Sequence, residues 1–162
     1  MPKVRRLAPP TTKKRALKAR RSEPKAAAPL ALRFQMESRR SAVAPAVDRV
    51  LEAVKDAHLS EDQIHDLAVA VAEALSNAAV HGNALRPDAT VRVRVQVVPR
   101  KHAIIEVKDA GRGFDHGDLS DPTDPSRILI PGGRGVFLMR RLVDNVEFLD
   151  SGSRVRMRIE RR

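Results

Sequence analysis

Alternation of apolar and polar residues along three segments constrains the fold of this chain more than any other feature of its sequence. The clearest case is residues 91–97, VRVRVQV, in which every second residue is a valine. Residues 30–37 and 153–160 alternate in the same way. Because successive side chains of a strand point to opposite faces of a sheet, each segment predicts a strand with one buried face and one wet face. Sheets that expose one face are commonly antiparallel, so we expect a mainly antiparallel sheet.

Three further segments place apolar residues at helical spacing, and two more have the character of strands. The helices are expected over residues 41–58, 60–81 and 134–143, and the extra strands over 103–109 and 146–150. Ser60 and Gln63 form a capping-box pattern at the start of the second helix, and Gly82 is expected to end that helix. The order of these elements predicts a two-layer α/β sandwich, with three helices on one face of a mixed, mainly antiparallel sheet.

The positive charge is concentrated at the N-terminus. Residues 1–29 carry ten basic residues against one acid, so the rest of the 162-residue chain carries only +2 of the total net charge of +11. Such a basic, proline-bearing segment cannot bury enough apolar surface to fold alone, so we expect a disordered tail at 1–29 and one folded domain at 30–162. The tail has no aromatic residue to stack on a base, which favours a solubilising role over nucleic-acid binding.

Several classes of protein are disfavoured by what the sequence lacks. It contains no cysteine, so disulfide bonds and thiolate metal sites are excluded and a reducing compartment fits. No apolar run approaches the roughly 18 residues that span a bilayer, and no apolar stretch follows the basic N-terminus as it would in a secretory signal. We therefore expect a cytoplasmic protein without a membrane partner.

The second predicted helix carries a polar stripe. Glu73, Asn77 and His81 follow at intervals of four, so their side chains share one helix face. The residues between them are small or apolar, and asparagine in mid-helix competes with helical hydrogen bonds, which makes it a poor choice for an ordinary surface. From this segment alone, a solvated face and a functional stripe are equally supported.

Two glycine clusters flank a long irregular segment over residues 110–133. The first, DAGRGFD at 109–115, follows the end of a strand, and the second, PGGRGVFLM at 131–139, leads into a helix. Glycine-rich backbone at a helix N-terminus can cradle a phosphate, because free N–H groups and the helix dipole both favour an anion. Each cluster alone is a weak signal, but their order and their combination with the polar stripe indicate a phosphate-binding site.

The patterns ExxxNxxxH, DxGxGF and GGRGxxLM together resemble the nucleotide-binding domain shared by histidine kinases, type II topoisomerases, the Hsp90 chaperones and MutL, the GHKL superfamily. Within that superfamily the chain looks most like the bacterial RsbW-like anti-sigma factor serine/threonine kinases. The resemblance runs from about Leu30 to the C-terminus. It implies the Bergerat ATP-binding fold, which is the α/β sandwich predicted above, with ATP and Mg²⁺ as cofactors.

The resemblance also implies a role for each member of the motifs. Glu73 would be the general base, Asn77 would hold Mg²⁺ through its side-chain oxygen, and His81 would either touch phosphate or help to cap the helix. Asp109 would accept a hydrogen bond from the adenine amino group. Gly111 and Gly113 would let the backbone approach the base. Gly133, Arg134 and Gly135 would contact the phosphates as part of a lid over 114–134. Ser153 stands where relatives often carry a threonine and would support the adenine-binding aspartate.

The activity implied by the resemblance is that of a protein serine/threonine kinase acting as an anti-sigma factor. Its partners would be a sigma factor that it sequesters and an anti-anti-sigma protein of the STAS type that it phosphorylates, and a homodimer is also implied. A nucleotide-responsive module that binds a partner without phosphorylating it remains an alternative. A histidine-kinase fragment would need an upstream phospho-acceptor helix pair, and a nucleic-acid binder would show a steep salt dependence carried by the tail.

Overall fold

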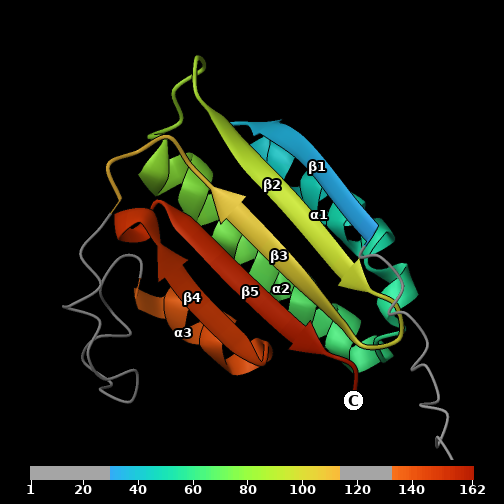
Figure 1. Cartoon of the computed structure of the whole chain (residues 1–162). Coiled ribbons are helices and arrows are strands. Elements are labelled where there is room, and N and C mark those ends of the chain that lie inside the picture. The colour runs from blue at the N-terminus through green and yellow to red at the C-terminus, as the bar shows by residue number, and fades with distance from the viewer. Residues whose placement is uncertain (1–29, 114–132) are drawn as a thin grey trace, which may run out of the picture.

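The computed structural model describes residues 30–113 and 133–162 of the chain. Within these ranges the order of helices and strands is the one that the sequence predicts, as Figure 1 shows. No helix in the described part is both long and apolar enough to cross a bilayer. The elements are β1 (Leu30–Glu37), α1 (Val43–Ala53), α2 (Glu61–Asn77), β2 (Thr90–Val98), β3 (His102–Lys108), α3 (Gly133–Leu142), β4 (Asn145–Leu149) and β5 (Arg154–Glu160).

The five strands form one sheet in the order β1-β2-β3-β5-β4, and every pairing between them is antiparallel. Hairpins join β2 to β3 and β4 to β5, and the first of these turns at Arg100, whose φ is 56°. The three helices lie together behind the sheet, while the other face of the sheet is left uncovered by them (Figure 1). The two-layer α/β sandwich expected from the sequence is confirmed.

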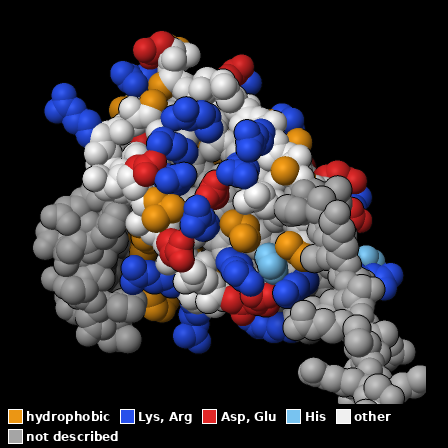
Figure 2. Space-filling model, viewed as in Figure 1, with side chains coloured by type: hydrophobic (Ala, Val, Ile, Leu, Met, Phe, Trp, Pro, Cys, Tyr) orange, Lys and Arg blue, Asp and Glu red, His pale blue; other side chains and the backbone are white. Residues whose placement is uncertain are grey.

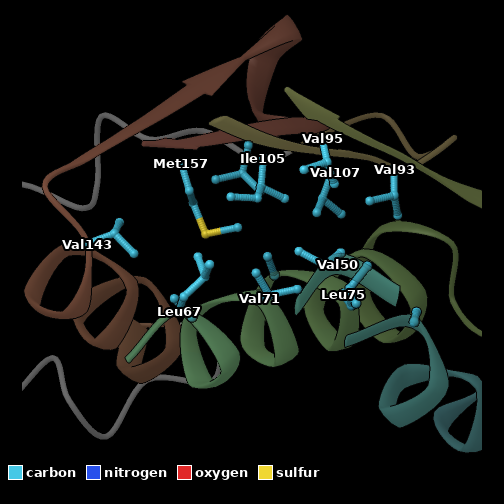
Figure 3. Close-up of a cluster of buried hydrophobic side chains, with 14 of the residues drawn as sticks. Val50, Leu67, Val71, Leu75, Val93, Val95, Ile105, Val107, Val143 and Met157 are labelled. Atoms are coloured by element: carbon cyan, nitrogen blue, oxygen red, sulfur yellow. The ribbon is translucent and has the colours of Figure 1, made fainter. Parts of the chain in front are cut away.

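The core lies between the two layers and consists almost entirely of aliphatic side chains. Alternate residues of β2, the valines at 91, 93, 95 and 97, are at most 2% exposed, and α2 contributes the fully buried Leu67, Val71 and Leu75. Figure 3 shows Val93 and Val95 of the sheet pointing toward the helix layer, and Leu67, Val71 and Leu75 pointing toward the sheet. Each such side chain stabilises the fold by about 1.5–3 kcal/mol relative to an exposed one. The period of two in the sequence therefore marks the packed face of the sheet.

The start of α2 is fixed by the predicted capping box. The Ser60 hydroxyl accepts a hydrogen bond from Gln63 N at 3.3 Å, and the Gln63 side-chain oxygen accepts one from Ser60 N at 3.2 Å. The Gln63 side-chain amide also donates to the carbonyl of Glu160 at 2.6 Å, which ties the helix start to the last strand. These bonds fix where α2 begins and therefore which of its residues face the sheet.

The end of α2 differs from the prediction. The α-helix stops at Asn77, and residues Ala78–Gly82 form a π-turn in which Asn83 N donates to the carbonyl of Ala78 at 2.8 Å. Gly82 does not take the left-handed conformation of a glycine cap, which among the described glycines only Gly113 and Gly152 adopt. The sequence reading of Gly82 as an ordinary helix stop is therefore wrong, and the reason for a glycine at this position lies in the contacts described next.

Candidate functional site

Two members of the predicted polar stripe face the start of α3. Glu73 and Asn77 lie one turn apart on α2, which packs against α3. A Cβ atom added to Gly135 would lie 2.7 Å from Glu73 Oε2 and 3.1 Å from Asn77 Nδ2. A side chain at this position would therefore crowd both polar groups. The glycine lets the backbone of the first turn of α3 approach a carboxylate and an amide that are held on one helix face.

His81 does not continue this stripe in the way that its spacing predicts. It lies in the π-turn, where the hydrogen bonds run between residues five apart, so the four-residue repeat is lost after Asn77. The His81 side chain is exposed. The structure thus brings Glu73 and Asn77 together at Gly135 and leaves His81 at the surface.

Asp109 follows β3 directly and is only 8% exposed. Its Oδ1 accepts a hydrogen bond from Gly111 N at 2.7 Å, and its own backbone N donates to the carbonyl of Ser153 at 3.0 Å. Burial raises the pKa of the Asp109 carboxyl above its ordinary value, because the charged form loses water; the hydrogen bond from Gly111 opposes this change. A buried carboxylate with one free oxygen is suited to accept a hydrogen bond from a ligand.

Two glycines make room for this carboxylate. A Cβ atom added to Gly82 would lie 2.5 Å from Asp109 Oδ2 and would overlap the carboxyl carbon. A Cβ atom added to Gly111 would overlap the backbone carbonyl of Gly82. The π-turn, the loop after β3 and the Asp109 side chain are therefore packed without space for a methyl group, which is the reason for glycine at position 82.

The turn between β4 and β5 forms a further wall of the site. Gly113 has φ of 78°, and a Cβ atom there would overlap the carbonyl oxygen of Ser151. Ser153 lies beside Asp109 through its backbone carbonyl, as given above, but its hydroxyl donates to the carbonyl of Asp150 at 2.9 Å. The contact between Ser153 and Asp109 is thus made by the main chain, whereas the resemblance implies one made by the hydroxyl.

Two parts of the predicted site fall at or beyond the limits of the described structure. Gly133 and Arg134 form the first residues of α3, and the side chain of Arg134 lies outside the described part. The predicted lid over 114–134 falls almost entirely on residues 114–132, which are not described.

Asn83 is a residue of this site that the sequence analysis missed. It is 1% exposed, its Oδ1 accepts a hydrogen bond from Ala110 N at 2.7 Å, and its Nδ2 donates to the Ser38 hydroxyl at 2.8 Å. Ser38 in turn donates to the carbonyl of Ala89 at 2.7 Å. This network joins the end of β1, the segment before β2 and the loop that carries Asp109. The segment that contains Asn83, GNALRPD at 82–88, resembles an ordinary polar turn, and nothing in its sequence indicates that Asn83 is buried.

The arrangement of a paired carboxylate and amide on α2, a glycine-led helix and a buried aspartate after a strand agrees with a family comparison. Residues 36–159 match the model of the histidine kinase-like ATPase domain. The chain belongs to this family. The resemblance to the GHKL superfamily that the motifs indicate is confirmed.

The sequence is also similar to curated proteins named serine-protein kinase RsbW and anti-sigma F factor. The serine-protein kinase RsbW of Bacillus licheniformis is 38% identical over 105 residues, which cover 60% of this chain and 65% of the relative. The anti-sigma F factor of Clostridium botulinum is 30% identical over 102 residues, covering 60% and 71%. The chain therefore matches about two thirds of the length of these relatives.

A solved structure shares the fold. The crystal structure of the RsbU and RsbW domains of a Mycobacterium tuberculosis protein superposes with a TM-score of 0.51 at 16% identity, over 82% of this chain and 32% of that one. At 16% identity the similarity supports the fold alone.

The burial of Asp109 predicts a pH dependence of stability. Above about pH 3.9 an unfolded aspartate ionises, whereas the folded protein retains its proton to higher pH. The folded state then binds more protons, so this residue lowers stability as pH rises through that window. We expect Asp109→Asn to match the wild type near pH 3.5 and to become the more stable protein as pH rises, in urea unfolding at several pH values. A stability difference independent of pH would contradict this account.

The Asn83 network predicts that Asn83→Ala destabilises the fold and that Asn83 and Ser38 are energetically coupled. Asn83→Ala leaves the N–H of Ala110 without an acceptor and removes one of the two partners of the Ser38 hydroxyl. An orphaned polar group costs about 1–3 kcal/mol. We expect a loss of that size in urea unfolding and faster hydrogen exchange at the Ala110 amide. Combined with Ser38→Ala, the two changes should be non-additive by about 0.5–3 kcal/mol. The control is Asn145→Ala, at an exposed position. If the stability losses of Asn83→Ala and Ser38→Ala simply add in the double variant, the two residues are not coupled and this account of the network is wrong.

Proposed function

We propose that the chain is an ATP-dependent protein serine/threonine kinase that acts as an anti-sigma factor. The observation that carries the proposal is the convergence of Glu73 and Asn77 on Gly135 at the start of α3, with the buried Asp109 in the same site. The matching family is that of an ATPase domain, and relatives are named serine-protein kinase RsbW and anti-sigma F factor.

In this proposal ATP is the substrate and lies between the two parts of the site. Asp109 accepts a hydrogen bond from the adenine amino group through the carboxylate oxygen that Gly111 leaves free. The backbone N–H groups of Gly133, Arg134 and Gly135, at the N-terminus of α3, bind phosphate oxygens where the helix dipole favours negative charge. Gly111 and Gly113 allow the backbone to approach the base.

Magnesium is implied by the family, and the donor set fits it. The described residues contain no group of three or more His, Cys, Asp or Glu side chains that could hold a metal ion. Mg²⁺ usually takes one or two side-chain oxygens and completes its shell with phosphate and water. The Asn77 side-chain oxygen, beside Glu73 at the glycine-led helix, is the ligand we assign to it. When bound, the ion neutralises charge on the phosphates.

Glu73 is assigned as the general base. It would take the proton from the serine or threonine hydroxyl of the substrate protein as that oxygen attacks the terminal phosphate. The position of Glu73 one turn from Asn77 keeps the base beside the phosphates. His81, which is exposed, is left with at most an outer contact to phosphate.

The names of the relatives suggest the protein partners. We infer a sigma factor that is sequestered and an anti-anti-sigma protein, of the STAS type, that is phosphorylated. A homodimer and a cytoplasmic location are part of the same proposal. A partner-binding module that responds to nucleotide without phosphorylating is the second candidate, since a nucleotide-binding site is needed in either case.

Glu73→Gln separates the two candidates. Loss of a general base lowers the rate by about 10²–10⁴, while an uncharged side chain of the same shape leaves nucleotide binding intact. The measurement is transfer of label from γ-labelled ATP with Mg²⁺ to a small protein in lysate of the source organism, followed by mass spectrometry of the acceptor residue. Phosphoserine or phosphothreonine made by the wild type alone is the expected result. Equal labelling by both proteins would refute the assignment of the base.

Asp109→Asn tests nucleotide binding in parallel with the labelling experiment. Losing a charged acceptor costs about 1.5–3 kcal/mol, so ADP affinity by calorimetry should fall roughly 10- to 150-fold. If the wild type labels nothing but binds ADP, and Asp109→Asn does not bind it, the module without kinase activity is correct. Normal ADP binding by Asp109→Asn would mean that the base-binding pocket lies elsewhere.

A further inference from the structure

The face of the sheet that the helices leave uncovered carries a dense group of cations. Figure 2 views this face, and Lys and Arg side chains gather over its strands. The residues lie at outward-facing positions of four neighbouring strands. The group, which we name the basic face, consists of Arg33 on β1, Arg92 and Arg94 on β2, Lys108 on β3, and Arg154 and Arg156 on β5.

The strand register sets several of these cations directly opposite one another. Arg33 on β1 lies directly opposite Arg94 on β2. Arg92 on β2 lies opposite Lys108 on β3, and Lys108 lies opposite Arg154 on β5. Like charges at directly opposite positions of an antiparallel pair destabilise the sheet. The folded protein therefore carries an electrostatic cost on this face that packing does not require.

Acidic side chains offset this cost only in part. Glu106, which is 8% exposed, pairs with Arg156 at 2.7 Å and more loosely with Arg94 at 3.8 Å. Asp150 bonds both Lys108 at 2.5 Å and Arg154 at 3.1 Å. Glu147 reaches Arg156 at 3.3 Å. Three carboxylates thus pair with four of the six cations.

Hydrogen-bonding capacity is also left over on the basic face. Within the described residues, the buried Nε atoms of Arg94 and Arg154 have no hydrogen-bond partner. In the same part of the chain, no ion pair is recorded for the exposed Arg33 or for Arg92. A guanidinium presents a planar fork of donors that matches a carboxylate.

We propose that the basic face is a docking surface for an acidic segment of a partner protein. Carboxylates of that segment would satisfy the remaining donors and separate the opposed cations. The proposal adds a protein-binding surface to the proposed function and stands whether or not the chain is a kinase. It also places a partner beside the candidate site, because Lys108 and Arg154 are the direct chain neighbours of Asp109 and Ser153.

Charge argues against a second copy of the chain, and side-chain composition argues against a nucleic acid. A second copy docked face to face would bring cations against cations, since a two-fold interface uses the same patch on both sides. A nucleic acid that stacks its bases on the protein would need aromatic side chains on this face. Among the described residues the face has no aromatic platform, because Phe34 and Phe148 pack toward the core, Phe137 lies on α3 and the chain has no Trp or Tyr.

The test measures binding of a fluorescein-labelled peptide of ten glutamates to the full-length chain by anisotropy at low salt. Arg33→Gln with Arg92→Gln should weaken binding about three- to tenfold, as expected for two exposed ion pairs. Asp150→Asn should strengthen it about two- to fivefold, because Lys108 and Arg154 lose their internal competitor. Asparagine also accepts the left-handed backbone of position 150, where φ is 51°.

Matched variants separate this surface from net charge and from the basic tail. Arg40→Gln with Arg140→Gln removes two exposed cations from helical segments, and Asp56→Asn removes one exposed acid between α1 and α2. The tail is identical in every protein. Smaller effects from these controls support the proposal, and effects equal to those of the basic-face variants overturn it.

Two further measurements cover the other occupants. If a DNA duplex loses more affinity than the peptide does in the Arg33→Gln, Arg92→Gln protein, the partner is a nucleic acid and the proposal is wrong. If sedimentation shows that this variant changes a dimer to a monomer, the face is occupied by a second copy and the proposal is likewise wrong. Circular dichroism melting confirms that each variant is folded, so a loss of binding reflects the surface.

Discussion

A carboxylate that has lost most of its water needs both donors and space, and the candidate site is organised around supplying these to Asp109. The N–H of Gly111 donates to it, and the missing side chains of Gly82 and Gly111 leave room for it. Gly82 lies at the end of the π-turn, so the irregular end of α2 belongs to the same arrangement. π-turns of this kind occur frequently at functional sites. The conformation of α2 after Asn77 is thus tied to a residue 27 positions beyond Gly82.

α2 gives the site its rigidity because it serves the core and the site at the same time. Leu67, Val71 and Leu75 are fully buried against the sheet, and the capping box with its link to β5 fixes the start of the helix. With one face fixed in this way, the helix cannot turn to carry Glu73 and Asn77 away from the start of α3. A polar pair on a packed helix is positioned more accurately than the same pair on a loop.

The sequence predicted the layers, the strand alternation and the capping box because each depends on residues close together in the chain. It also predicted that Glu73 and Asn77 share a face, since helical spacing decides this. It failed at the end of α2, where the π-turn depends on the contact of Gly82 with Asp109. It missed Asn83, whose partners are Ser38, 45 positions away, and Ala110, 27 positions away. Contacts of this range follow from tertiary packing and leave no periodic signal.

The turn between β4 and β5 connects the two surfaces of functional interest. Asp150 and Ser151 both have φ of 51°, a left-handed conformation that costs non-glycine residues free energy and persists where neighbouring contacts impose it. Those contacts come from opposite sides. The Asp150 carboxylate bonds Lys108 and Arg154 on the basic face, and hydrogen bonding from Lys108 lowers the pKa of Asp150. The Ser151 carbonyl fills the space beside Gly113 in the candidate site. An anionic group that competed with Asp150 for these two cations would remove one side of this support. It would therefore act directly on the turn against which the glycine loop is packed.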